Sequence, residues 1–248
     1  MQVKRSKNLL AILAVAVAVA LPTTAFAADP TITLKVNGAD ITAFQGAPVL
    51  IEDGFWMSSL VAEDAGWSLT GDIYFGEFAG ERAFIDYFLH AVGGSDITSF
   101  TLTLTLPFVH GPYTGLNSSH SSDITDGGAA QLATVAAGVS EYSFIHTALL
   151  DNAIVAGGEI SKGCADNGLA GFTLTCQLPL TQSNLPVAPG GDGNLGVALS
   201  FTVSPHDKFS FNGNVSLVGA VVPEPTTYLS ILAGLVGLFG VIVRRRIR

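Results

Sequence analysis

The strongest regular pattern in this 248-residue chain is a strict alternation of apolar and polar residues. Residues Thr101 to Leu106 read T-L-T-L-T-L, so the leucines point to one side of the backbone and the threonines to the other. Residues 197–204, 209–212 and 215–218 alternate in the same way. A period of two with many β-branched and aromatic residues is typical of strands that have one buried and one hydrated face.

Further strand-like segments occupy residues 31–36, 72–78, 83–90, 142–149 and 172–178. Turn-forming clusters rich in Gly, Asp and Ser separate them, for example at 93–96 and 189–194. About ten strands at this spacing predict an all-β body, an antiparallel β-sandwich with a jelly-roll-like arrangement. Residues 57–65, capped by Ser58 or Ser59, are the best candidate for a short helix, and residues 129–138 suit a helix or a strand.

The N-terminal residues have a different pattern. Lys4, Arg5 and Lys7 precede the apolar run 9–21, which is followed by the small-residue pattern Ala25-Phe26-Ala27. This order is typical of a secretory signal peptide, and we expect cleavage between Ala27 and Ala28. The alternative is an uncleaved anchor, which the two alanines disfavour.

The C-terminal residues 222–248 have three parts in a fixed order. Val222, Pro223, Glu224 and Pro225 come first, an uncharged apolar segment follows at about 226–243, and Arg244, Arg245, Arg246 and Arg248 end the chain. About 18 residues of helix span roughly 27 Å, which approaches the thickness of a membrane's hydrocarbon core. Arginine clusters stay on the cytoplasmic side, so we expect one transmembrane helix with the body on the opposite side.

This order of motif, apolar helix and terminal arginines resembles the PEP-CTERM sorting signal of Gram-negative bacteria. The resemblance covers the last 27 residues and implies recognition by an exosortase, a membrane-embedded cysteine peptidase or transpeptidase. It also implies export linked to extracellular polysaccharide and biofilm production. The alternative is a plain C-terminal anchor, whose prolines merely end the preceding strand. The chain therefore divides into a signal peptide (1–27), a β-sandwich body (28–221) and a sorting tail (222–248).

Without its two ends the chain is strongly acidic. Residues 28–222 contain 19 of the 20 acidic residues, and their only lysines and arginines are Lys35, Arg82, Lys162 and Lys208. The formal charge of this part is therefore −15, against −9 for the whole chain. Such a body is repelled by nucleic acid and by anionic lipid, so neither is an expected partner. Its length is sufficient for one domain with a substantial core.

Cys164 and Cys176 are the only two cysteines, and they flank the turn signal Asp166-Asn167-Gly168. In a translocated domain this spacing predicts a disulfide at the base of a hairpin-like loop. A loop of this size gives roughly 3 kcal/mol of stabilisation in the chain-entropy model. A metal site is less favoured, because it needs more ligands than these two.

Catalytic motifs with fixed spacing are missing from the sequence, including the nucleophile elbow, H-E-x-x-H and the phosphate-binding loop. The weak candidates for a metal site are His110, His120, Asp123 and Asp126, although a solvated loop is the favoured interpretation. Glycosidase chemistry needs two carboxyl groups that face each other across a sugar-sized cleft. The candidates for such a pair are Glu52 with Asp53, Glu63 with Asp64, and Asp72 with Glu77 and Glu81, all of which also suit exposed turns.

Aromatic residues are concentrated in the first third of the body, where core packing is favoured over stacking on sugar rings. They are Trp56, Trp67, Tyr74, Phe75, Phe78, Phe84, Tyr87 and Phe88. We therefore expect a non-enzymatic, cofactor-free protein destined for the cell surface or matrix and associated with exopolysaccharide. Its expected partners are an exosortase and, at least transiently, the inner membrane. The alternatives are a secreted carbohydrate-active enzyme and a permanently anchored periplasmic binding protein.

Overall fold

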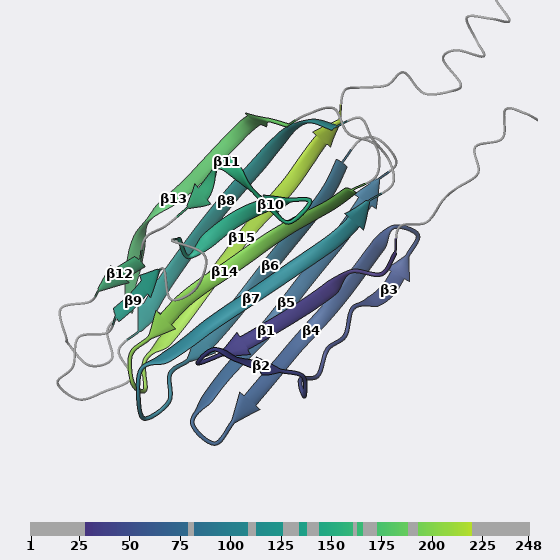
Figure 1. Ribbon diagram of the computed structural model, residues 1–248. Helices are drawn as coiled ribbons and strands as arrows, with labels where there is room; N and C mark the ends of the chain where they lie inside the picture. Colours follow the sequence, from purple (N-terminus) through teal and green to yellow (C-terminus); the bar gives the residue numbers. More distant parts are fainter. Residues whose placement is uncertain are drawn as a thin grey trace, which may run out of the picture.

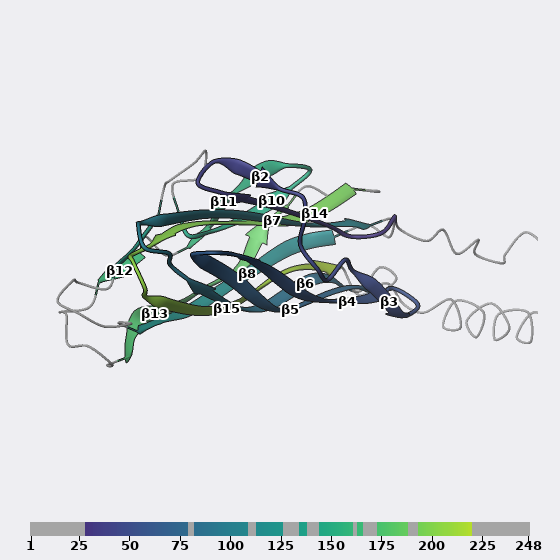
Figure 2. The same cartoon turned by 90° about the horizontal axis from the view of Figure 1, so that it is seen from below.

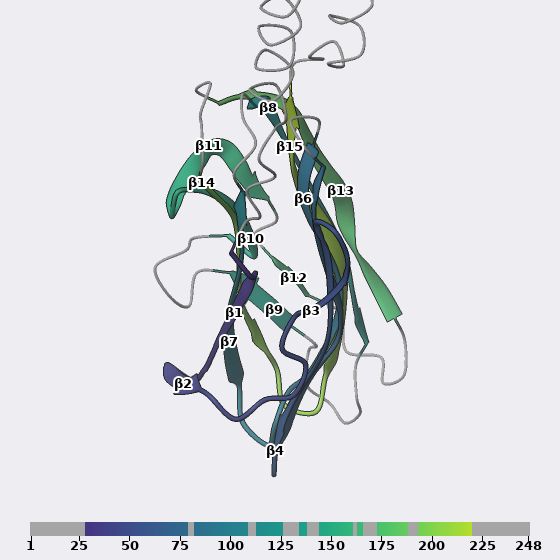
Figure 3. The same ribbon diagram turned by 90° about the vertical axis from the view of Figure 1, so that its right-hand side faces the viewer.

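The computed structural model describes residues 28–78, 82–108, 113–125, 134–137, 144–160, 163–165, 173–187 and 193–219. All the regular secondary structure of these residues is β-strand. The strands form two antiparallel sheets that pack face to face, and Figures 2 and 3 show the two layers edge-on. The predicted antiparallel two-sheet body is therefore confirmed.

The first sheet, called sheet A here, has the spatial order β11-β10-β14-β7-β1-β2 (Figure 1). The short strand β9 pairs with β14, and β12 pairs with β9. In chain order the strands are β1 (Thr31–Val36), β2 (Ala39–Ile41), β7 (Thr98–Phe108), β9 (Thr134–Ala137), β10 (His146–Leu150), β11 (Ala153–Ile160), β12 (Gly163–Ala165) and β14 (Gly193–Val203).

The second sheet, sheet B, has the spatial order β13-β8-β15-β6-β5-β4-β3. Its strands are β3 (Val49–Glu52), β4 (Phe55–Asp64), β5 (Trp67–Phe78), β6 (Arg82–Val92), β8 (Tyr113–Thr125), β13 (Thr173–Pro186) and β15 (Lys208–Gly219). Strands β3 to β6 follow one another as a meander, whereas the chain passes to sheet A for β7 and returns for β8. The finer jelly-roll description stays a prediction.

The core lies between the sheets and follows from the alternation in each strand. Leu102, Leu104 and Leu106 of β7 are fully buried, while the threonines between them are half-buried on the outer side. Aromatic rings fill the middle of the sandwich, where Phe201 of β14 lies 5.0 Å from Phe211 of β15 between ring centroids. Burying apolar surface of this kind is the main source of stability for a domain of this size.

The expected short helix at 57–65 is wrong, because residues 57–64 belong to the strand β4 and Ala65 begins the turn after it. Trp56, Ser58 and Leu60 are buried, whereas Ser59 and Val61, which alternate with them, are exposed, which is the period of a strand. Pairing with β5 along its whole length decides the conformation of this segment over its helical signals. Residues 134–137 of the ambiguous segment form the strand β9.

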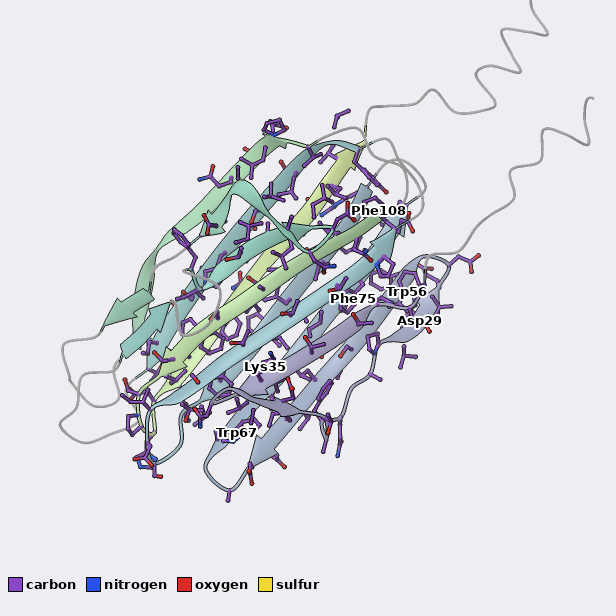
Figure 4. All side chains as sticks on the ribbon, in the orientation of Figure 1. Asp29, Lys35, Trp56, Trp67, Phe75 and Phe108 are labelled. Atoms are coloured by element: carbon purple, nitrogen blue, oxygen red, sulfur yellow. The ribbon has the colours of Figure 1, made fainter. Side chains whose placement is uncertain are left out.

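One end of the sandwich holds Gly219, the last described residue before the predicted sorting tail. β1 begins and β15 ends there, since Thr31 pairs with Thr105 near the end of β7 and Gly219 pairs with Tyr113 at the start of β8 (Figure 1). Figure 4 places Trp56 and Phe108 toward this end and Trp67 toward the opposite one. We call it the tail-proximal end.

Candidate functional site

Most residues of the predicted export signals lie outside the described part of the chain. These are Ala25 and Ala27 of the cleavage site, the motif 222–225 and the arginine cluster, whereas Ala28 is the first described residue. The expected transmembrane segment at about 226–243 also lies outside it. In the part of the chain that the structure describes, no helix is long and apolar enough to cross a membrane.

The weak metal candidates do not come together where they are described. His120 and Asp123 both belong to β8, but His120 is buried on the inner side while Asp123 is half-exposed on the outer side. An odd separation along a strand places two side chains on opposite faces. His110 and Asp126 lie outside the described residues. Across the described ranges, no group of three or more His, Cys, Asp or Glu side chains is placed to hold a metal ion.

His120 instead belongs to a buried polar group, the Tyr–His cluster, formed by Tyr87, Ser118, His120 and His146. The Tyr87 hydroxyl of β6 lies 3.0 Å from Nδ1 of His120 and 2.6 Å from Nδ1 of His146. Nε2 of His146 lies 2.7 Å from the hydroxyl oxygen of Ser118. Because His146 is on β10 and the other three are on β6 and β8, the cluster joins sheet A to sheet B through the core.

One arrangement of protons fits this geometry. A phenol has a single proton, so it donates to one imidazole nitrogen and accepts from the other. If the Tyr87 hydroxyl donates to Nδ1 of His146, then Nε2–H of His146 donates to Ser118. The hydroxyl of Tyr87 then accepts from Nδ1–H of His120, whose Nε2 has no hydrogen-bond partner among the described residues. This arrangement leaves a lone pair unpaired at that atom instead of a buried N–H.

Burial keeps the cluster uncharged at neutral pH. It lowers the pKa of His120 to about 4 and raises the pKa of Tyr87 above its ordinary value. The pKa of His146 is also lowered, first by burial and then by the proximity of His120. The desolvation of an imidazolium or a phenolate is the common cause.

Gly213 of β15 makes room for this cluster. A side chain at position 213 would meet the Tyr87 hydroxyl and the backbone carbonyl of Ser119. The cluster is therefore a packed, hydrogen-bonded link between the sheets, with the features of a structural core group.

The carboxylates considered for glycosidase chemistry are also divided between faces. Asp72 and Glu77 lie on opposite sides of β5, with Asp72 on the outer side and Glu77 buried on the inner side. Glu81 lies outside the described residues. Glu63 and Asp64 line a shallow hollow of about 450 Å³ that also includes His206, at the end opposite the tail. Glu52 and Asp53 are exposed beside the turn between β3 and β4.

The aromatic residues of the first third divide between the two faces of sheet B. Trp56, Phe75 and Tyr87 are buried in the core, as the sequence predicted. The outer aromatic patch takes the alternate positions of the same strands and consists of Phe55, Tyr74, Phe78, Phe84 and Phe88. Four of its rings are neighbours, because Tyr74 stacks on Phe55 at 6.2 Å and Phe78 stacks on Phe84 at 5.9 Å between centroids. The Phe88 ring lies edge-on to His90 at 4.9 Å between centroids. Phe88 is 49% exposed.

A polar groove lies beside this patch on the same outer face of sheet B. It has a volume of about 470 Å³ and is lined by Arg82, Asn117, Ser118, Ser119, Thr181, Ser183, Asn214, Ser216 and Val218. The Ser118 hydroxyl points inward to His146, so this residue does not offer its hydroxyl to the groove. The Arg82 guanidinium lies 4.7 Å from the centre of the Phe84 ring and so joins the groove to the patch. Hydroxyl and amide groups predominate, so the groove offers both hydrogen-bond donors and acceptors to a ligand.

This face therefore combines two contacts that suit a sugar chain. Aromatic rings can stack on the apolar side of a pyranose ring, and the polar groove can bind its hydroxyl groups. The aromatic residues are evident in the sequence, but their division into an inner and an outer set was not predicted. The alternation within β5 and β6 carried that signal, since Tyr74 and Phe88 occupy the polar-facing positions of their strands.

Fold and surface together define an antiparallel β-sandwich with an open aromatic and polar face on one sheet. Comparison with known families indicates how the protein is sorted, because residues 221–246 match the PEP-CTERM protein-sorting motif. The predicted resemblance of the tail is thereby confirmed. The motif indicates an exported protein that is anchored in the membrane by its C-terminus before an exosortase processes it. No curated protein matches the chain.

Proposed function

We propose that this protein is a non-enzymatic component of the cell surface or extracellular matrix that associates with exopolysaccharide through the outer face of sheet B. The match of residues 221–246 to the sorting motif carries the first part of this proposal, since it gives the export route. The outer aromatic patch and the polar groove support the second part.

The position of the tail is consistent with delivery of a folded domain. β15 ends at Gly219, two residues before the matched motif begins. The tail-proximal end would therefore lie next to the membrane before processing. The polar groove lies toward that end, because Arg82 and Val218, which line it, pair with each other one residue before β15 ends. Phe88 and Asp72 lie farther along the strands, away from that end.

The carboxylates of β5 that the sequence offered to a carbohydrate-active enzyme are not placed as a catalytic pair, which favours a binding role. A glycosidase holds two carboxyl groups about 5 to 10 Å apart on either side of the scissile bond. Asp72 and Glu77, which the sequence offered as such a pair, are on opposite faces of sheet B. The groove on the outer face is lined by Arg82 and neutral residues.

The proposal is tested by mixing the protein isolated from its host with the host's purified exopolysaccharide. We expect the protein to sediment with the polymer and to release no new reducing ends from it. Replacement of Phe88 by Ala should reduce co-sedimentation, whereas Ile154→Ala on β11, which removes a similarly exposed apolar side chain from sheet A, should not. Release of reducing ends would favour the enzyme, and absence of co-sedimentation would contradict the proposed binding role.

A further inference from the structure

Aromatic rings and carboxylates alternate on the outer face of β5 and β6. Tyr74 of β5 lies directly opposite Asp86 of β6, and Asp72 of β5 lies directly opposite Phe88 of β6. Residues in such opposed positions have Cβ atoms about 5 Å apart, so each ring has a carboxylate beside it. The two pairs are neighbours on the same face. In one pair the ring is on β5 and the carboxylate on β6, and in the other pair the order is reversed.

Both carboxylates are held in place by neutral partners. The Ser59 hydroxyl donates a hydrogen bond to Asp72 at 2.8 Å, and the Asn214 side-chain amide donates one to Asp86. A carboxylate has about four acceptor positions, so each of these two keeps capacity for a ligand. Neither bond neutralises the negative charge.

A row of side chains connects these pairs to the polar groove across six strands of sheet B. In spatial order its members are Met57, Tyr74, Asp86, Asn214, Ser119 and Thr181. Neighbouring strands lie about 4.8 Å apart, so the row spans roughly 24 Å, the length of about five pyranose units in an extended chain. The last three members line the groove.

Charge distinguishes the kind of sugar that suits this row. The body carries a formal charge of −15, and the row itself contains Asp86 but no basic residue. Basic side chains elsewhere on this face include Arg82 in the groove and His90 beside Phe88. A polyanionic polysaccharide would be repelled, whereas a protonated amine would be attracted to Asp72 and Asp86 and to the adjacent rings of Phe88 and Tyr74. We infer that the outer face of sheet B binds a polysaccharide whose pyranose units carry free amino groups. This inference rests on the proposed function and specifies its ligand.

The test compares three oligosaccharide probes of equal length by isothermal titration calorimetry on the protein isolated from its host. The probes are a glucosamine hexamer with free amines, its fully N-acetylated form and a hexamer of uronic acids. At mildly acidic pH, where the amines are protonated, we expect the free-amine hexamer to bind at least about tenfold more tightly than the N-acetylated form, a difference of about 1.4 kcal/mol. This preference should weaken as salt is added.

Two substitutions locate the effect on this face. Asp86→Asn and Asp72→Asn keep the shape of each side chain and should each reduce the affinity for the free-amine probe severalfold. Asp40→Asn on β2 of sheet A makes the same change in net charge at an exposed position, so it should leave the affinity unchanged. Circular dichroism and urea unfolding of each variant show whether the fold is kept.

The outcomes separate this inference from the proposed function. Equal binding of the free-amine and N-acetylated probes would overturn the preference for amines while leaving a polysaccharide-binding face. Tighter binding of the uronic acid probe would overturn it as well and would point to Arg82 instead of the aspartates. Failure of all three probes, with intact co-sedimentation on the host's exopolysaccharide, would overturn the inference alone. Failure of both assays would overturn the proposed function too.

Discussion

The Tyr87 hydroxyl lies between two buried imidazoles and makes a hydrogen bond with each of them. These two hydrogen bonds connect three strands of two sheets. Each imidazole nitrogen that loses its partner inside a protein costs about 1 to 3 kcal/mol. The core around the cluster is apolar, with Phe211 6.1 Å from the Tyr87 ring between centroids, so little else can replace the lost hydrogen bonds. The Tyr87 hydroxyl oxygen should therefore contribute more to the free energy of unfolding than a single exposed polar atom does.

Tyr87→Phe removes that atom and leaves the ring in place. We expect it to lower the free energy of unfolding by about 2 to 4 kcal/mol, because Nδ1 of His120 and Nδ1 of His146 both lose their partner. Urea unfolding followed by tryptophan fluorescence measures the change. Tyr74→Phe makes the same substitution on the outer face and should change stability by less than about 0.5 kcal/mol. Equal losses in the two variants would contradict the account of the cluster.

The two histidines also predict how stability depends on pH. The pKa of His120 is about 4 in the folded protein, below its ordinary value of 6.5, so the unfolded chain binds more protons between these values. The free energy of unfolding should therefore fall as the pH is lowered from about 6.5 toward 4, by roughly 3 kcal/mol from His120 alone. The pKa of His146 is lowered in the same direction and adds to the loss.

Urea midpoints measured across this pH range test the prediction. The titratable group in direct contact with both rings is Tyr87, which stays protonated throughout the range. His120→Gln should flatten the pH dependence, because it removes the imidazole whose pKa is lowered by burial. An unaltered slope in the His120 variant would show that other groups control the acid sensitivity.

At the scale of elements, the alternation of residues predicted the sheets well. The expected strand at 31–36 has the bounds of β1, and the T-L-T-L-T-L segment forms the centre of β7 with its leucines inward. The two short segments at 209–212 and 215–218 are one continuous strand, β15, because Gly213 between them pairs with Tyr87 on β6 and His120 on β8.

The partners across the sandwich were not predictable from the sequence. Tyr87, His120 and His146 are separated by 33 and 26 residues, and no local pattern specifies which strands meet in the core. The same limit applies to the row on the outer face of sheet B, whose members come from six strands. Local alternation in the sequence shows which face of a sheet each residue occupies. The spatial order of the strands decides which residues lie beside it on other strands.

The two cysteines illustrate the same limit, because the strands that carry them could not be placed from the sequence. Cys164 is on β12, which pairs with β9 beside sheet A, and Cys176 is on β13 of sheet B. The two strands are therefore not partners in a hairpin, although their backbones approach within 8 Å. The disulfide stays a prediction, and it would tie the two sheets together instead of the base of a hairpin.

Mass spectrometry of non-reduced peptides tests for this bond in the protein isolated from its host. If it is present, Cys164→Ser should lower the free energy of unfolding by about 3 kcal/mol under oxidising conditions. The same substitution should have much less effect after reduction of both proteins. Two free thiols in the isolated protein would contradict the prediction.

At the scale of the whole molecule, one β-sandwich is combined with an export signal that matches a known sorting motif at residues 221–246. β1 begins and β15 ends at the same tail-proximal end, so the mature body would be cut from both predicted signals at one end of the sandwich. The proposed polysaccharide-binding face lies along sheet B and does not depend on either signal. Sorting and the proposed binding should therefore be separable in this chain.

The most direct test of the central claim is the intact mass of the protein from its own host, with mapping of its C-terminal peptide. We predict a mature chain that begins near Ala28 and ends between Pro223 and Thr226, recovered with the cell surface or the matrix. A chain that still ends at Arg248 and is found only in membranes would contradict exosortase processing. The protein would then be a permanently anchored periplasmic protein.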